Sequence, residues 1–319
     1  MGEQDLTVPK SQKILLTGAT GFLGSHLLRA FIENGFQVVI LKRSFSDTWR
    51  IRDCLDKVKS FDIDIVPLEK PFEECGQFDC VVHTAVNYGR KGETLVKVFK
   101  TNLELPLRLI QIATFFNTST FFNTSTFFNT ANILYQHLSY YNLSKRQFDD
   151  WGRIYANQGK IRFVSIRLEH MYGPNDDPSK FTTHVVQSCL KNIPEFTLTP
   201  GEQKRDFIYI DDVVEAYLKL LENCTTEEAE FQEYEVGSGK AVSIREYVET
   251  VHSLTKSATR LKFGALPYRD NEIMYSEADI SRIVNLGWKP KHDLVSGLRK
   301  MIEGERGCPQ KKEKNLCVF

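Results

Sequence analysis

The sequence predicts an α/β protein in which a doubly wound parallel sheet is followed by a smaller C-terminal lobe. Up to about residue 170, short β-rich runs alternate with helical patterns. Three glycines directly follow the first apolar run, and Gly173-Pro174 begins a stretch in which the alternation is lost. With 319 residues, the chain is long enough for about two packed units.

The order of elements gives the expected organisation. Six strands are expected at Lys13–Thr17, Gln37–Leu41, Ile63–Leu68, Asp79–Thr84, Thr120–Thr124 and Arg162–Arg167. The main helical stretches are Val96–Ala113 and Ser144–Asn157, and Asp206–Asn223 reads as a strand followed by a helix. We therefore expect a first domain at 1–170 to which 205–225 return, a second lobe mostly at 171–307, and a loose polar tail at 308–319.

The amino-acid composition gives no support for several classes of partner. Lys plus Arg and Asp plus Glu both number 41, so the charge balance gives no argument for nucleic acid or a membrane surface. No apolar run approaches the ~20 residues that span a bilayer, and the N-terminus resembles no secretory signal. Seven cysteines are dispersed without C-x-x-C spacing, which is typical of reduced thiols rather than a zinc site. We expect a cytoplasmic protein with a small polar ligand and no metal.

The glycine-rich turn predicts a phosphate site. The apolar strand from Ile14 to Leu16 runs into Gly18, Gly21 and Gly24, and an apolar helix pattern follows. Such a turn lets a pyrophosphate approach backbone N–H groups at a helix N-terminus, as in a Rossmann-type dinucleotide-binding unit. The residues expected to contact the cofactor here are Gly18, Thr20, Gly21, Phe22, Leu23 and Gly24.

The end of the second strand favours NADP over NAD. A unit that binds NAD has an acidic residue near this point for the ribose hydroxyls, whereas this strand ends in Lys42 and Arg43. Two cations suit the 2′-phosphate of NADP. The alternative is an ordinary solvated strand end.

A tyrosine and a lysine four residues apart supply the chemistry. Tyr141 and Lys145 share one face of a predicted helix, and a nearby ammonium lowers the pKa of a phenol. Tyr141 is therefore a candidate proton donor or acceptor for a carbonyl/alcohol pair.

With these motifs in place, the chain resembles the extended short-chain dehydrogenase/reductase family over about residues 12–300. The resemblance also rests on Val81–Ala85, Asn102, Arg167–Pro174, Arg205–Asp212 and Leu286–Pro290. It implies that the cofactor pocket includes His83, Thr84, Ala85 and Asn102. It also implies that copies of the chain can pair as homodimers through two helices, one following Asn102 and one carrying Lys145.

In this family a Ser or Thr at the end of the fifth strand polarises the substrate carbonyl. A tandem hexapeptide, TFFNTS-TFFNTS-TFFNTA from Thr114 to Ala131, occupies this region. Its register is ambiguous: Thr124 is the preferred candidate, with Ser125 and Thr126 beside it at the substrate, and Thr118 is the same residue one copy earlier.

The resemblance also narrows the reaction. Dehydratases of the family carry two acids after this Thr, and Ser125 and Thr126 stand in their place, so elimination lacks its acid/base pair. A 4-epimerase retains NAD, whereas Lys42 and Arg43 suggest exchangeable NADPH, which leaves net reduction of a keto sugar. The details are most similar to the bacterial group of CDP-abequose and CDP-paratose synthases, which reduce the C4 ketone of CDP-4-keto-3,6-dideoxyglucose with NADPH. The implied substrate residues are His170, Arg205 and Arg269. A 4-epimerase, a reductase of dTDP-4-keto-6-deoxyglucose and a non-catalytic NADP-binding regulator are the alternatives.

Overall fold

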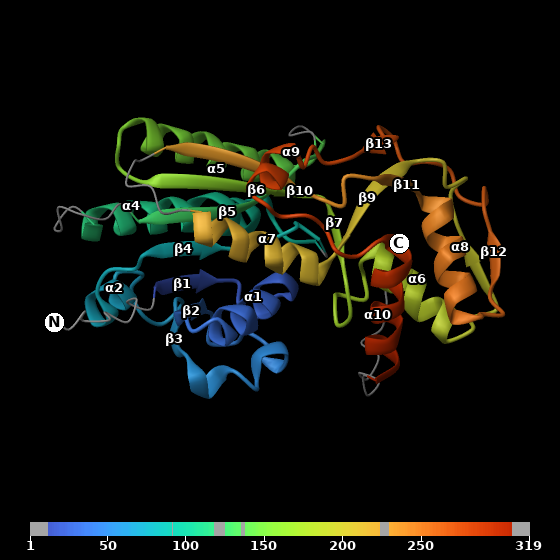
Figure 1. Cartoon of the computed structure of the whole chain (residues 1–319), viewed down its shortest axis with the longest axis horizontal. Coiled ribbons are helices and arrows are strands. Elements are labelled where there is room, and N and C mark those ends of the chain that lie inside the picture. Colours follow the sequence, from blue (N-terminus) through green and yellow to red (C-terminus); the bar gives the residue numbers. More distant parts are fainter. Residues whose placement is uncertain (1–11, 91, 118–124, 135–137, 224–229, 308–319) are drawn as a thin grey trace, which may run out of the picture. The chain divides into compact units, whose positions relative to one another are not determined.

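The computed structural model describes residues 12–90, 92–117, 125–134, 138–223 and 230–307. The contact pattern separates two compact units (Figure 1). The first contains the described residues of 1–131, 139–165 and 224–233, and the second those of 132–138, 166–223 and 234–319. Residues 205–223 group with the second unit in this division, and the domain bounds expected from the sequence (1–170 with 205–225 returning to it, then 171–307) stay predictions.

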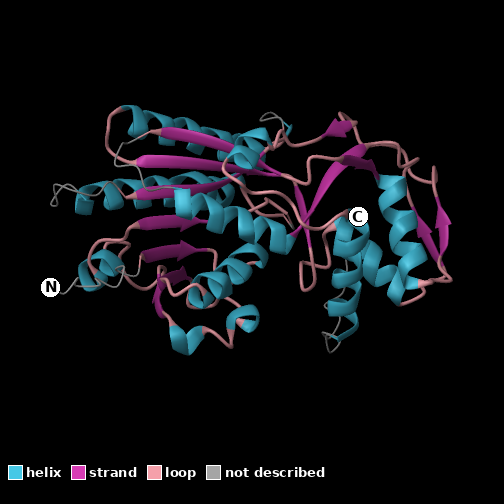
Figure 2. Cartoon of the chain, in the orientation of Figure 1, coloured by secondary structure: helices cyan, strands magenta, loops and turns pink. Residues whose placement is uncertain are grey.

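A seven-stranded sheet forms the centre of the first unit, in the order β10-β6-β5-β4-β1-β2-β3. Figure 2 shows these strands side by side. They are β1 (Lys13–Thr17), β2 (Gln37–Lys42), β3 (Lys59–Asp62), β4 (Cys80–His83), β5 (Thr126–Asn132), β6 (Arg162–Leu168) and β10 (Phe231–Val236). The ladders that join β3, β2, β1, β4 and β5 are parallel. This confirms the predicted Rossmann-like, doubly wound fold.

Helices flank this sheet. They are α1 (Phe22–Glu33), α2 (Lys70–Cys75), α3 (Leu95–Phe99), α4 (Leu105–Asn117) and α5 (Tyr140–Asn157), with short turns η1 (Trp49–Ile51), η2 (Leu55–Lys57) and η3 (Lys100–Glu104). The helix expected at Val96–Ala113 is therefore divided into α3 and α4 by a π-helical turn, η3. Such turns are frequent at functional sites.

Two strands lie elsewhere than predicted. The third strand is Lys59–Asp62, paired with β2, while the apolar run at 63–68 forms turns in which Ile65 is 68% exposed. The strand expected at Thr120–Thr124 is Thr126–Asn132, paired with β4. The tandem repeat explains the second error, because its copies are nearly identical and each has the same β-forming residues.

Aromatic packing fixes the register of β5. Phe127 lies between Phe148 of α5 and Phe163 of β6, with ring centroids 5.5 and 5.7 Å away. All three rings are fully buried. Burying Phe127 on the α5 face fixes the face of every other residue in the strand, because side chains alternate along it.

The second unit is built around β9 (Lys204–Tyr209), which pairs with β7 (His170–Tyr172), β11 (Ala241–Ser243) and β13 (Tyr275–Ser276). A separate pair joins β8 (Glu195–Thr197) and β12 (Arg260–Lys262). The helices are α6 (Phe181–Leu190), α7 (Ile210–Asn223), α8 (Ile244–Thr255), α9 (Ser281–Asn285) and α10 (Leu294–Gly307).

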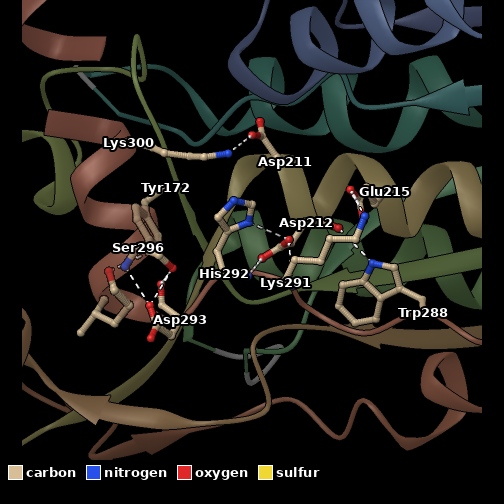
Figure 3. Close-up of polar contacts among 11 residues, drawn as sticks. Tyr172, Asp211, Asp212, Glu215, Trp288, Lys291, His292, Asp293, Ser296 and Lys300 are labelled. Atoms are coloured by element: carbon tan, nitrogen blue, oxygen red, sulfur yellow. Dashed lines mark hydrogen bonds and ion pairs between the residues drawn. The ribbon is translucent and has the colours of Figure 1, made fainter. Parts of the chain in front are cut away.

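Asp212 explains why α7 groups with this unit. Its buried carboxylate accepts hydrogen bonds from the backbone N–H groups of Lys291 and His292 and pairs with the His292 ring at 2.9 Å (Figure 3). The Trp288 indole donates to its backbone carbonyl at 3.2 Å. Asp212 thus anchors the late Leu286–Pro290 segment, a structural role.

Within the described residues, no helix has the length and apolar character needed to cross a bilayer. Nor do three or more His, Cys, Asp or Glu side chains cluster there as potential metal ligands.

Candidate active site

The glycine turn is built by close backbone packing. Gly18 has φ +74°, and a Cβ there would lie 2.5 Å from Thr84 Oγ1. A Cβ on Gly24 would lie 2.1 Å from the Gly18 carbonyl oxygen. Gly21 differs: it is exposed, and its Cβ would approach that oxygen only to 3.1 Å. Gly18 and Gly24 therefore shape the turn, and Gly21 is at its open surface.

This surface suits an anion. Gly21 precedes the first turn of α1, which contains no acidic residue and no side-chain cap. The backbone N–H groups of a first helical turn and the positive end of the helix dipole favour a phosphate there. Thr20 is half-buried beside Gly21, whereas Phe22 and Leu23 are buried under the turn.

The end of β4 supports the turn from beneath. Thr17 Oγ1 lies 2.8 Å from His83 Nδ1, and the Thr84 hydroxyl donates to the Thr17 carbonyl at 2.8 Å. The N–H of Ala85 donates to Thr17 Oγ1 at 3.3 Å. His83 is fully buried, and burial holds its pKa well below the usual value, so the ring is neutral. It is a buried support of the turn.

Asn102 joins two segments of the site. Its amide oxygen accepts from the Asn87 N–H at 2.7 Å, and its Nδ2 donates to the Asn87 carbonyl and to Ser144 Oγ. Asn102 is fully buried in η3. The Asn102 amide thus binds the loop after β4 through Asn87 and binds α5 through Ser144. It therefore holds these two segments of the site together.

The predicted pair lies at the start of α5. Ser139 caps this helix by accepting from the Asn142 N–H at 3.2 Å. Tyr141 is half-buried and its ring packs against Tyr88, 5.0 Å between centroids. Lys145 is buried one turn further on, and its ammonium donates to the Thr130 carbonyl at 2.7 Å.

Burial lowers the pKa of Lys145 to about 8, and the carboxylate of Asp149 opposes that shift. The sequence analysis did not identify Asp149 or Asn129, whose side-chain amide donates a hydrogen bond to the Asp149 carboxylate at 2.8 Å. The signal available for Asp149 was its spacing, four residues beyond Lys145 on the same predicted helix.

The fifth strand brings a different hydroxyl to the site than predicted. Thr124 and Thr118 lie outside the described residues. Ser125 and Thr126 are buried at the beginning of β5, where the Ser125 hydroxyl donates to the Phe78 carbonyl and the Thr126 N–H to the Asp79 carbonyl. The expectation that these two residues lie at the strand's carboxyl end is therefore wrong.

Thr130 occupies the position near the carboxyl end of the fifth strand that was predicted for Thr124. It lies near the end of β5 and is half-buried, and its carbonyl oxygen accepts a hydrogen bond from the Lys145 ammonium. It is the same residue of the repeat, one copy later. Ala131 and Asn132 follow it, so Thr130 carries the hydroxyl nearest the strand end.

The two cations at the end of β2 differ. Lys42 is largely buried and ion-paired with Asp62 of β3. Arg43 is exposed, with its guanidinium carbon 4.7 Å from the centroid of the Phe45 ring. Because the charge of Lys42 is already balanced, Arg43 is the better placed of the two to meet an added phosphate.

The predicted substrate residues lie in the second unit. The His170 ring pairs with the buried Glu169 carboxylate at 2.8 Å. Arg205 is buried on β9 and ion-paired with Glu272 at 2.6 Å, and burial lowers its pKa. The Glu272 N–H donates to the carbonyl of the exposed Arg269. Glu272 thus links Arg205 to the turn that begins at Arg269.

A protein-family model supports the interpretation of the first unit as a dinucleotide-binding unit. The model of the NAD dependent epimerase/dehydratase family matches residues 14–237. A CDP-abequose synthase of Salmonella typhimurium is 36% identical over 304 residues, which cover 91% of this chain and 97% of that protein. A putative UDP-glucose 4-epimerase of Methanocaldococcus jannaschii is 25% identical over 91% of this chain and 97% of its own.

Solved structures share the fold. A UDP-glucuronic acid 4-epimerase from Bacillus cereus, in complex with UDP-glucuronic acid and NAD, has a TM-score of 0.79 at 22% identity. The match covers 92% of this chain and 99% of that one. A UDP-glucose 4-epimerase of Thermus thermophilus in complex with NAD has a TM-score of 0.78 at 22% identity and covers 93% and 100%. By the family model and the Salmonella relative, this chain belongs to the NAD dependent epimerase/dehydratase family.

Proposed function

We propose that this protein reduces the C4 ketone of a nucleotide-linked 4-keto-deoxyhexose with NADPH, as a step in the synthesis of a surface polysaccharide. The preferred substrate is CDP-4-keto-3,6-dideoxyglucose, giving CDP-abequose or CDP-paratose. The observation that carries this proposal is the Tyr141/Lys145 pair on α5, in the same unit as the glycine turn, in a chain 36% identical to a CDP-abequose synthase.

The residues of the first unit fit a dinucleotide. The turn at Gly18–Gly24 is closely packed, has the exposed Gly21 at its surface and leads into the N-terminus of α1, which suits a pyrophosphate. When bound, the cofactor supplies the hydride. The Tyr141 hydroxyl donates a proton to the ketone oxygen as the alcohol forms, the Lys145 ammonium stabilises the phenolate left behind, and the Thr130 hydroxyl donates a hydrogen bond to the same oxygen.

The direct test is a substrate panel. NADPH consumption would be followed with CDP-, dTDP- and GDP-linked 4-keto sugars, and the product identified by NMR. We expect stoichiometric oxidation of NADPH with the CDP-linked 3,6-dideoxy substrate. Oxidation with the dTDP-linked 6-deoxy substrate alone would move the assignment to a dTDP-4-keto-6-deoxyglucose reductase. The absence of oxidation with every substrate would contradict the reductase proposal.

The similarity in fold to 4-epimerases makes epimerisation of a nucleotide sugar the second candidate function. Solved 4-epimerases in complex with NAD share this fold. A 4-epimerase that retains its NAD would carry the cofactor through gel filtration and consume none. Purified protein without bound nicotinamide, together with net NADPH oxidation, would exclude this alternative.

NADPH preference is expected to depend on Arg43. Because the exposed Arg43 guanidinium can pair with a 2′-phosphate, Arg43→Ala should weaken NADPH binding about 10-fold to 100-fold. NADH binding should change little. Fluorescence titrations of both cofactors measure the ratio, with Arg52→Ala, another exposed arginine of this unit, as the control. Equal losses for NADPH and NADH would argue against a 2′-phosphate contact.

Thr130 is expected to carry the hydroxyl role. Thr130→Val removes the hydroxyl with little change in shape and should lower kcat about 100-fold. Thr124→Val in the preceding copy of the repeat should cost less. Both variants would be assayed for NADPH oxidation, and Thr130→Ser should restore most of the rate. A larger loss in Thr124→Val would assign the role to the second copy.

We further propose that the protein acts as a homodimer. The first unit exposes large apolar side chains on α3, α4 and α5: Leu95, Val96, Phe99, Phe115, Trp151 and Ile154. Apolar surface of this kind on neighbouring helices suits a second copy of the chain. Analytical ultracentrifugation would report the oligomeric state.

A further inference from the structure

Three polar side chains follow one face of α5 into the interior. Tyr141, Lys145 and Asp149 are spaced by four residues, which places them one above the other on the helix. Tyr141 is half-buried, whereas Lys145 and Asp149 are only 3% and 2% exposed. The face thus runs from the proton donor to a buried carboxyl group with no part in the mechanism above.

The Asp149 carboxyl group is held by two strands. Asn129 Nδ2 of β5 and Ser165 Oγ of β6 both donate to its Oδ1 at 2.8 Å. These hydrogen bonds favour the carboxylate, although burial raises the pKa of Asp149 to about 6. At neutral pH the Asp149 carboxyl group is therefore mostly ionised. Its hydrogen bonds to β5 and β6 hold it in place between α5 and the sheet.

The Lys145 ammonium needs such a partner. The ammonium donates a hydrogen bond to a neutral acceptor, the Thr130 carbonyl, and a buried charge is costly unless it is paired. Besides Tyr141 on the same helix, the titratable groups among the described residues that act on the pair are His83 of β4, which is neutral, and Glu233 of β10, which acts on Asp149. Asp149 is thus the anion that favours the charged form of Lys145.

We propose that Asp149 is a positioning residue: its buried carboxylate is the internal counter-ion that keeps Lys145 protonated beneath Tyr141. This rests on the proposed function for its catalytic meaning, but the charge pairing itself does not. With one ammonium proton directed to Thr130, two remain for the tyrosine hydroxyl and the cofactor ribose. Asn129 and Ser165 act through Asp149 by fixing its orientation.

The test reads the protonation of Lys145 without substrate or cofactor. The full chain labelled with ¹³C-lysine would be titrated by NMR, and the Lys145 signal assigned by its loss in Lys145→Met. The wild-type midpoint is expected near pH 8. Asp149→Asn keeps the shape and removes the charge, and should lower that midpoint by about one pH unit or more.

Matched variants keep the proposal falsifiable. Asp150→Asn alters the next residue, whose carboxylate is exposed and pairs with Arg146, and should leave the midpoint unchanged. Asp149→Glu retains the charge and should keep the midpoint near that of the wild type. If Asp149→Asn fails to fold, Asp149→Ser provides the charge-free variant.

An unchanged Lys145 midpoint in the charge-free variant would overturn the proposal, whatever the substrate panel shows. A lowered midpoint in a protein that turns over no keto sugar would support the counter-ion and contradict only the proposed function. Where turnover is measured, the basic limb of kcat/KM should move to lower pH by the same amount as the midpoint, which loss of packing alone would not produce.

Discussion

Tyr141→Phe should lower the rate of ketone reduction by about 1000-fold. The substitution removes one oxygen atom and with it the proton that the forming alcohol needs. The Tyr141 ring packs against Tyr88, and phenylalanine keeps that contact, so the fold and the glycine turn should remain intact. Single-turnover oxidation of NADPH measures the chemical step, and fluorescence titration shows whether cofactor binding is kept within a few-fold.

Tyr140 provides the matched control. It precedes Tyr141 in the same helical turn but is 64% exposed, and Tyr140→Phe should keep the wild-type rate. Full turnover by Tyr141→Phe with every accepted substrate would show that another group donates the proton, and the assignment of the site would then be wrong.

The regular parts of the fold could be predicted because local signals agreed. The first strand, the glycine turn and α1 follow one another with an apolar strand, three glycines and an apolar helix face. The Tyr141/Lys145 pair was accessible for the same reason, since both residues lie on one helix and their spacing alone puts them on one face.

The fifth strand could not be predicted from local signals. Copies of a six-residue repeat differ by an even number of positions, so each places the same side chains on the same face of a strand. Only the tertiary contacts of one copy distinguish them: Phe127 packs against α5, and Asn129 donates to Asp149. The same limit hid Asp149, whose carboxyl group gains its meaning from partners on β5 and β6 that lie 20 and 16 residues away in the sequence.

The structure adds a supporting role for two buried polar residues that the resemblance placed in the cofactor pocket. The resemblance implied that His83 and Asn102 contact the cofactor, and the structure shows both fully buried and bonded to neighbouring segments. His83 Nε2 and Asn129 Oδ1 are buried without a hydrogen-bond partner among the described residues. These two residues face each other in the β4–β5 ladder.

Gly24→Ala should destabilise the protein by about 3 kcal/mol or more. Alanine in place of glycine ordinarily stabilises a helix by about 1 kcal/mol, so the expected sign is reversed. The reason is the new Cβ, which would lie 2.1 Å from the Gly18 carbonyl oxygen and 2.6 Å from its carbon. Backbone atoms cannot rotate away as a flexible side chain can, so β1 and α1 must move apart. Denaturant unfolding monitored by circular dichroism measures the loss.

Gly21→Ala separates this packing requirement from cofactor binding. Gly21 has φ −78° and ψ 177°, a conformation open to any residue, and its Cβ would approach the Gly18 oxygen only to 3.1 Å. The variant should be destabilised much less than Gly24→Ala, by about 1 kcal/mol or less. Its methyl group, however, stands on the exposed turn where the pyrophosphate would approach, so NADPH binding should weaken at least about 10-fold. If Gly21→Ala bound NADPH normally, the phosphate would have to lie elsewhere. If Gly24→Ala unfolded at the wild-type midpoint, the close approach of α1 to β1 would not be the reason for that glycine.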